Sequence, residues 1–219
     1  MFNRKEYKVQ ALARLKGNWR INLLVSATIL VLGWISNLPF SRYYYDSFQL
    51  YLIFTLLSIA IAGIAAMALA YFSIKFFKAG EAVSYGTFIE GMNLWLKGIL
   101  ATLWVSLWLF LWGLLFIIPG IVKSYSYSQI YFILAENPNL SVSKALQISK
   151  IITRGYKGEL FVQDLSFFGW IILSLLTGSL GLVFLTPYYQ GAKTHAYAYL
   201  KEQALSTGTL KASDFTDLN

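Results

Sequence analysis

The residues best suited to chemistry are ionisable side chains inside apolar segments. Counted from the inner ends of their segments at 1.5 Å per helical residue, Asp164 lies about 9 Å deep and Lys193 about 12 Å deep, with His195 close by. Charged groups at such positions usually face a partner or a wet cavity. We expect Asp164 and Lys193 to pair between neighbouring antiparallel helices, with Gln163 beside them. Snorkelling to the interface is the simpler interpretation, and a transport site is the alternative.

A second polar group comprises Ser124, Tyr127, Ser128 and Tyr131, which share one helical face. Such a face should avoid lipid and look towards other helices. Polar faces of this kind most often form hydrogen bonds between helices. The alternatives are that the face lines a polar path or binds a lipid headgroup.

Several kinds of chemistry lack the residues they need. The chain has no cysteine and a single histidine, which excludes thiolate metal sites and sites that need two imidazoles. A turn at 178–181 contains a serine between glycines, but a tight glycine turn explains it without a nucleophile. We therefore expect no catalytic residue, no cofactor and no metal. The net charge of +8 lies in patches beside apolar runs, which indicates topology signals and headgroup contacts rather than nucleic acid.

The composition is that of a helical membrane protein. Of the 219 residues, 57% are hydrophobic and only 13% are charged, whereas soluble domains carry about 25% charged residues. Long apolar runs with few charges predict membrane spans. The expected spans are 21–38, 50–77, 98–118, 120–135, 160–177 and 181–200.

The fourth span is tested by the placement of charge. If six spans cross and the N-terminus is cytoplasmic, only Arg42 and Lys123 of the 18 basic residues lie outside. A single helix over 98–135 would be about 57 Å long, nearly twice the hydrocarbon thickness. The chain must turn, and Pro119-Gly120 is the expected corner. We expect both termini in the cytoplasm, and the segment 120–135 either spans fully or is re-entrant.

Two further segments are predicted to be amphipathic helices at the cytoplasmic face, 1–19 and 140–155. In the first, Val9, Leu12 and Ala13 cluster at helical spacing. In the second, Asn139 or Ser141 is a suitable N-cap. The expected fold is thus all-α, a polytopic bundle of six transmembrane helices plus two interfacial helices. It forms one domain over 1–205, followed by a polar tail over 206–219.

Four motifs carry a family resemblance: LKGNW at 15–19, IIPGI at 117–121, YFILAENP at 131–138 and SKAL at 143–146. In their order, the chain resembles the uncharacterised integral membrane family of Gram-positive bacteria called domain of unknown function nine-seven-five. The resemblance implies an all-helical protein of the bacterial cytoplasmic membrane. It implies no activity.

These observations favour a non-catalytic membrane protein that acts as an accessory, interaction or envelope-associated module. Its expected partners are membrane lipids, with anionic headgroups at the cytoplasmic face, and either another protein or further copies of itself. The alternative function is a small transporter or channel for a solute, a lipid or a hydrophobic peptide. That alternative requires a polar cavity in the inner half of the helical bundle.

Overall fold

The computed structural model describes residues 1–36, 48–115 and 117–215, and every regular element in these ranges is helical. The α-helices are α1 (Arg4–Leu15), α2 (Trp19–Ser36), α4 (Phe48–Ser73), α5 (Tyr85–Met92), α6 (Trp95–Leu115), α7 (Ile117–Tyr127), α8 (Ile130–Glu136), α9 (Val142–Ile152), α10 (Lys157–Leu176) and α11 (Gly181–Ser206). A π-helix η1 (Ile74–Lys78) continues α4, and a 3₁₀ helix η2 (Ala212–Phe215) follows α11. The predicted all-α class is confirmed.

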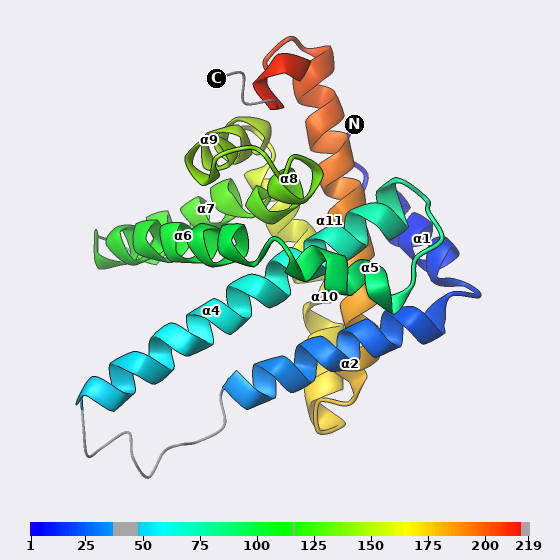
Figure 1. Cartoon of the computed structure of the whole chain (residues 1–219). Helices are drawn as coiled ribbons and strands as arrows, with labels where there is room; N and C mark the ends of the chain where they lie inside the picture. Colours follow the sequence, from blue (N-terminus) through cyan, green and yellow to red (C-terminus); the bar gives the residue numbers. More distant parts are fainter. Residues whose placement is uncertain (37–47, 116, 216–219) are drawn as a thin grey trace.

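Three antiparallel hairpins organise the chain: α2 with α4, α6 with α7, and α10 with α11. Figure 1 shows the three tips pointing away from a shared centre. The helical stretches Phe48–Lys78, Trp95–Leu114 and Lys157–Leu176 are long and apolar enough to cross a membrane. A fourth candidate results if α1 and α2, bent by 107°, count as one span. The structure thus supports three to four candidate spans, and six are not confirmed.

The corner of the second hairpin differs from its prediction. Pro119 and Gly120 lie inside the first turn of α7, which begins at Ile117, and do not form the connection between α6 and α7. The first turn of a helix tolerates proline because its amide hydrogen would have no intrahelical acceptor there. Gly120 faces α6, where a Cβ atom on it would lie 3.5 Å from the Cα of Gly113, an ordinary contact distance.

The expected span 120–135 is broken in two. α7 ends at Tyr127 and α8 begins at Ile130, and α9 covers the break. The hydroxyl of Ser149 on α9 donates to the carbonyl of Ser126 at 2.8 Å and accepts from the amide of Gln129 at 3.3 Å. A single buried serine thereby satisfies two backbone groups that the break removes from the helical ladder.

Both predicted amphipathic helices pack onto the protein. The buried face of α1 is formed by Tyr7, Ala11 and Leu15, whereas Val9 and Leu12 of the expected cluster are exposed. The buried residues of α9 are Ala145, Leu146, Ile148, Ser149 and Ile152. Ser141, one of the two expected N-caps, accepts a hydrogen bond from the amide of Lys144 at 3.4 Å.

The segment after 205 is not simply a polar tail. α11 continues to Ser206, and Leu210 and Phe215 return to the hydrophobic core, where each is 6% exposed. Residues 216–219 and most of the connection 39–49 between the first two expected spans lie outside the described residues.

The hydrophobic core gathers at the inner ends of the hairpins. α4 and α6 cross there at Gly63 and Gly98, where a Cβ on either residue would meet the other's carbonyl oxygen at 2.6 Å or less. Towards the tips the apolar side chains are exposed, and at most 22% of the best window in each candidate span is buried. The outer parts of the hairpins therefore need an apolar surrounding.

The first and third hairpins run at a steep angle to each other. α1 is antiparallel to α11, because Phe2 stacks edge-on with Tyr199 at 5.7 Å while Ala11 lies against Gly191. α2 is antiparallel to α4 within its own hairpin. α1 and α2 are bent by 107°, and Figure 1 shows the first and third hairpins running in clearly different directions. A bundle of near-parallel spans is not what the described residues form.

Candidate functional site

Three distant segments bring polar side chains together at the inner ends of the hairpins. The π-helix η1 ends at Lys78, α8 ends at Glu136, and α11 presents Tyr197 and Lys201 one turn apart. π-helical turns often occur at functional sites because they redirect a side chain. Asn137 follows Glu136 and donates its side-chain amide to the carbonyl of Ile133 at 2.9 Å, which closes the end of α8. We call Lys78, Glu136, Tyr197 and Lys201 the clasp.

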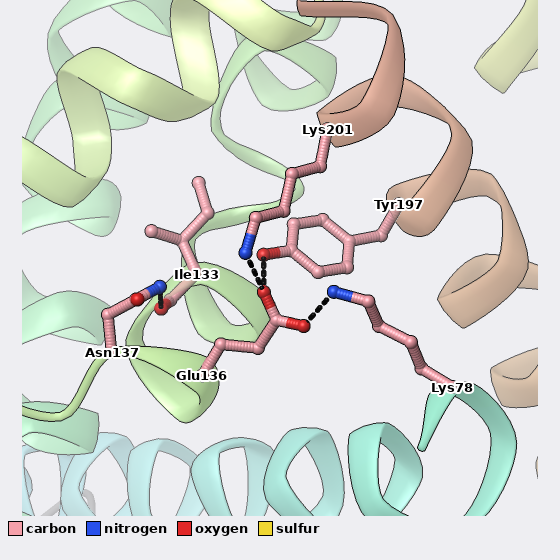
Figure 2. A network of polar contacts seen from close by, with 6 residues as sticks. All are labelled: Lys78, Ile133, Glu136, Asn137, Tyr197 and Lys201. Atoms are coloured by element: carbon pink, nitrogen blue, oxygen red, sulfur yellow. Dashed lines mark hydrogen bonds and ion pairs between the residues drawn. The ribbon is translucent and has the colours of Figure 1, made fainter. Parts of the chain in front are cut away.

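The carboxylate of Glu136 is the centre of the clasp (Figure 2). Its Oε2 accepts hydrogen bonds from the Tyr197 hydroxyl at 2.6 Å and from the Lys201 ammonium at 2.5 Å. Its Oε1 forms an ion pair with the ammonium of Lys78. The side chain of Glu136 is 11% exposed, and those of Lys78 and Lys201 are 29% and 20% exposed. One carboxylate therefore fastens the first and third hairpins to the end of the second.

The charges of the clasp keep Glu136 ionised. Burial by itself would raise the pKa of this carboxyl, but hydrogen bonds from Lys201, Lys78 and Tyr197 outweigh burial and lower the pKa below its ordinary value. Charge-assisted hydrogen bonds are stronger than those between neutral groups, so the three donors fix the position of the carboxylate. A carboxylate engaged in this way is suited to joining elements, not to accepting a substrate proton.

Aromatic rings support the clasp from both sides. Tyr197 stacks on Phe132 of α8 at 5.3 Å, and the ammonium of Lys201 lies 4.6 Å from the ring of Phe215 in η2. The outer side of the clasp borders a pocket of about 480 Å³, whose wall also contains Lys75 and Glu81, paired at 3.2 Å. The clasp thus lies at the surface of the core and is reached from the inner end of the molecule.

The polar layer expected around Asp164 forms a separate, smaller site. Gln163, Asp164, Lys193 and Ser128 line one cavity of about 20 Å³ together with Tyr125, Gln129 and Leu160. Asp164 accepts from the hydroxyl of Tyr189 at 2.9 Å, and no ion pair joins it to Lys193 among the residues that the structure describes. The amides of Gln163 and Gln129 are each 1% exposed and keep polar atoms without a protein partner. Such a cavity has room for about one water molecule.

His195 lies apart from this cavity. It is two residues from Lys193 on α11, so the side chains are about 200° apart around the helix. The His195 ring packs edge-on against Phe77 at 6.2 Å, and its Nε2 has no partner in the described residues. The structure brings Gln163, Asp164 and Lys193 together and leaves His195 on another face.

The serine and tyrosine face is divided by the break after Tyr127. Ser124 donates to the carbonyl of Ile121, and Ser128 donates to that of Tyr125, so both hydroxyls serve their own helix. Tyr131 exchanges a hydrogen bond of 2.8 Å with Thr102 on α6, and Tyr127 is buried. Apart from Ser128, these residues point to helix packing rather than to the cavity.

Metal ligands do not gather in the described ranges: no group of three or more His, Cys, Asp or Glu side chains could hold a metal ion there. Three members of the clasp and all the residues that line the Asp164 cavity instead fall within one continuous stretch, 125–201. This stretch is recognised by a known family. Residues 114–204 match the family described as protein of unknown function (DUF975).

The DUF975 match confirms the resemblance over these residues. It covers α7 to most of α11 and includes three members of the clasp, while Lys78 lies outside it. No curated protein and no solved structure matches the chain. The function therefore has to be argued from the geometry of the site.

Sequence reasoning missed the clasp. Glu136 lies in the motif YFILAENP, where it is the only charge at the end of an apolar segment, and this was the available signal. Tyr197 and Lys201 have the i, i+4 spacing of neighbours on one helical face. Nothing in the spacing shows that these two segments meet each other or Lys78.

Proposed function

We propose that this chain is a non-catalytic, multi-pass protein of the bacterial cytoplasmic membrane, which acts as an accessory or interaction module. The observation that carries the proposal is the division between a polar, fastened inner end and exposed apolar hairpin tips. Lipid is the surrounding that such tips require. The two partly buried carboxylates already have protein donors: three for Glu136 and Tyr189 for Asp164. This supports a structural role over acid–base catalysis.

The proposed topology has six membrane-embedded segments in three hairpins and both termini in the cytoplasm. The basic residues at the inner ends of the hairpins support it. Anionic lipid headgroups are the proposed partners at this face, together with another protein or a second copy of the chain. No nucleic acid is proposed, because the basic residues border apolar helices.

A test combines membrane extraction with reconstitution. The protein should stay with the membrane after alkaline carbonate washing, and liposomes that contain it should release trapped solutes no faster than empty liposomes. Purification in mild detergent should return the same partner protein, or a defined oligomer, from repeated preparations. Specific solute flux together with the absence of any partner would overturn the proposal.

The second candidate function is transport of a small solute, and one observation favours it. Gln163, Asp164 and Lys193 line a buried polar cavity next to the break between α7 and α8. A volume of about 20 Å³ fits one water molecule and not a continuous path, so this candidate requires the cavity to open. Flux that Asp164→Asn and Lys193→Gln each abolish would support transport. Unchanged cell phenotype and protein level in both variants would remove it.

A further inference from the structure

A groove lies between the α1/α2 bend and the end of the third hairpin. Its volume is about 440 Å³, within the usual range of ligand pockets. The walls are mainly apolar: Leu12 and Trp19 come from the bend, Trp170 and Leu173 from α10, and Phe184 and Leu185 from α11. Trp170 and Leu173 belong to a candidate membrane span, so hydrocarbon is the medium expected around this wall.

Basic residues stand at the bend itself. Gly17 has a φ of +84°, which lets the chain turn by 107° between α1 and α2. Lys16 and Arg20 lie on either side of Trp19 in the sequence, and both are exposed. Neither is paired with a carboxylate in the part of the chain that the structure describes. They are free to bind an anion near the mouth of the groove.

The exposed face of α1 extends this arrangement. Lys5, Val9, Leu12 and Lys16 lie within one narrow arc of the helix, with the cations at its two ends and the apolar residues between them. Lysines in such positions reach lipid headgroups while their neighbours touch acyl chains. The tryptophan of the bend also suits the membrane interface.

We propose that this groove binds one anionic phospholipid of the cytoplasmic leaflet. An acyl chain lies between Trp19 and the α10/α11 wall, and the phosphate is held by Lys16 and Arg20. Charge complementarity selects this occupant over a neutral lipid, since each basic residue near a headgroup favours anionic lipid. The inference rests on the proposed membrane embedding and adds a defined lipid site to it.

Lipid binding is tested on delipidated protein in detergent, titrated with phosphatidylglycerol or phosphatidylcholine and measured by native mass spectrometry. One phosphatidylglycerol molecule should bind to each chain, with phosphatidylcholine bound more weakly. K16E/R20E should weaken phosphatidylglycerol binding by at least about tenfold. L173W, which fills the groove, should weaken both lipids.

Matched variants separate the site from general lipid contact. R154E/K211E changes the net charge as much as K16E/R20E does, at exposed positions that neither belong to α1 nor line the groove, and should retain binding. L165W alters an exposed leucine of α10 that does not line the groove, and should also retain it. The lipid site is overturned if K16E/R20E and L173W bind both lipids as the natural chain does, or if two chains associate without lipid. Failure of the protein to remain in carbonate-washed membranes would instead overturn the proposed function.

Discussion

Glu136 shows how much one side chain contributes to this fold. Its carboxylate joins η1, α8 and α11, which are far apart in the sequence. Replacing it with glutamine leaves Lys78 and Lys201 close together without a counter-charge. We expect E136Q to lower the free energy of unfolding by about 3 kcal/mol. This value is near the lower limit of the loss seen when one partner of a buried ion pair is removed, because both lysines are partly exposed. Thermal unfolding in detergent measures this loss.

The matched control is E81Q. Glu81 pairs with Lys75 at 3.2 Å, but their side chains are 48% and 35% exposed. An exposed pair contributes about 1 kcal/mol or less, so E81Q should unfold nearly as the natural chain does. Equal losses in E136Q and E81Q would show that the clasp does not hold the hairpins together.

The clasp also predicts a dependence of stability on pH. The folded pKa of Glu136 is lowered, so its contribution is complete above the unfolded value of about 4.3 and is lost as the pH falls through the folded pKa. We expect the unfolding temperature of the natural chain to fall on acidification below about pH 4.5. E136Q should show a shallower fall over the same range. Parallel profiles for the two proteins would contradict this assignment.

Residue patterns predicted part of the candidate sites. The similar depths of Asp164 and Lys193 along two apolar segments predicted that they lie close together, with Gln163 beside them. These three residues do line one cavity. The hydrogen-bond partner of Asp164 is Tyr189, which depth alone did not indicate because an aromatic ring in a span usually reads as packing. The clasp could not be predicted, since its residues meet only through the tertiary fold.

At the scale of elements, helices were more predictable than their breaks. Apolar runs gave α2, α4, α6 and α10 within a few residues, because hydrophobicity and helix propensity are local. The break between α7 and α8 is not local, because its backbone groups are satisfied by Ser149 of α9. The shift of the hairpin corner has a similar cause: Pro119 is as compatible with a first helical turn as with a bend.

Ser149 provides a test of this account of the break. Alanine at this position leaves the carbonyl of Ser126 and the amide of Gln129 without the hydroxyl that joins them. We expect S149A to lower the free energy of unfolding by about 1–3 kcal/mol, the usual cost of unsatisfied buried polar groups. S143A changes an exposed serine on the same helix and should have little effect. If S149A matched S143A in thermal unfolding, the break would not depend on α9.

The whole molecule has the odd property that its hairpins diverge. The apolar composition of the helices was enough to predict that they enter a membrane. The angles between the helices could not be predicted, because these angles depend on contacts such as Ala11 against Gly191 and on the bend at Gly17. Two spans that diverge as steeply as the first and third hairpins cannot both stay within the usual tilt of up to 40°.

We therefore propose that the hairpins differ in their depth in the membrane. Trp19 at the α1/α2 bend lines the same groove as Thr177 and Gly181 at the tip of the third hairpin. If the basic bend is cytoplasmic, the tip lies towards the cytoplasmic leaflet rather than outside the cell. This arrangement agrees with the proposed cytoplasmic position of both termini, because a shallow hairpin returns to the side from which it entered.

Single cysteines can measure this depth, since the chain has none of its own. Intact cells are treated with a membrane-impermeant maleimide, and inverted vesicles are treated in parallel. S41C, in the connection between α2 and α4, should be labelled from outside, and S143C on α9 only in inverted vesicles. S179C, at the tip of the third hairpin, should resist labelling from outside because the steep angle keeps the tip near the bend. Labelling of S179C from outside as readily as S41C would mean that the third hairpin crosses fully, and the angle between the hairpins would then have to close in the membrane.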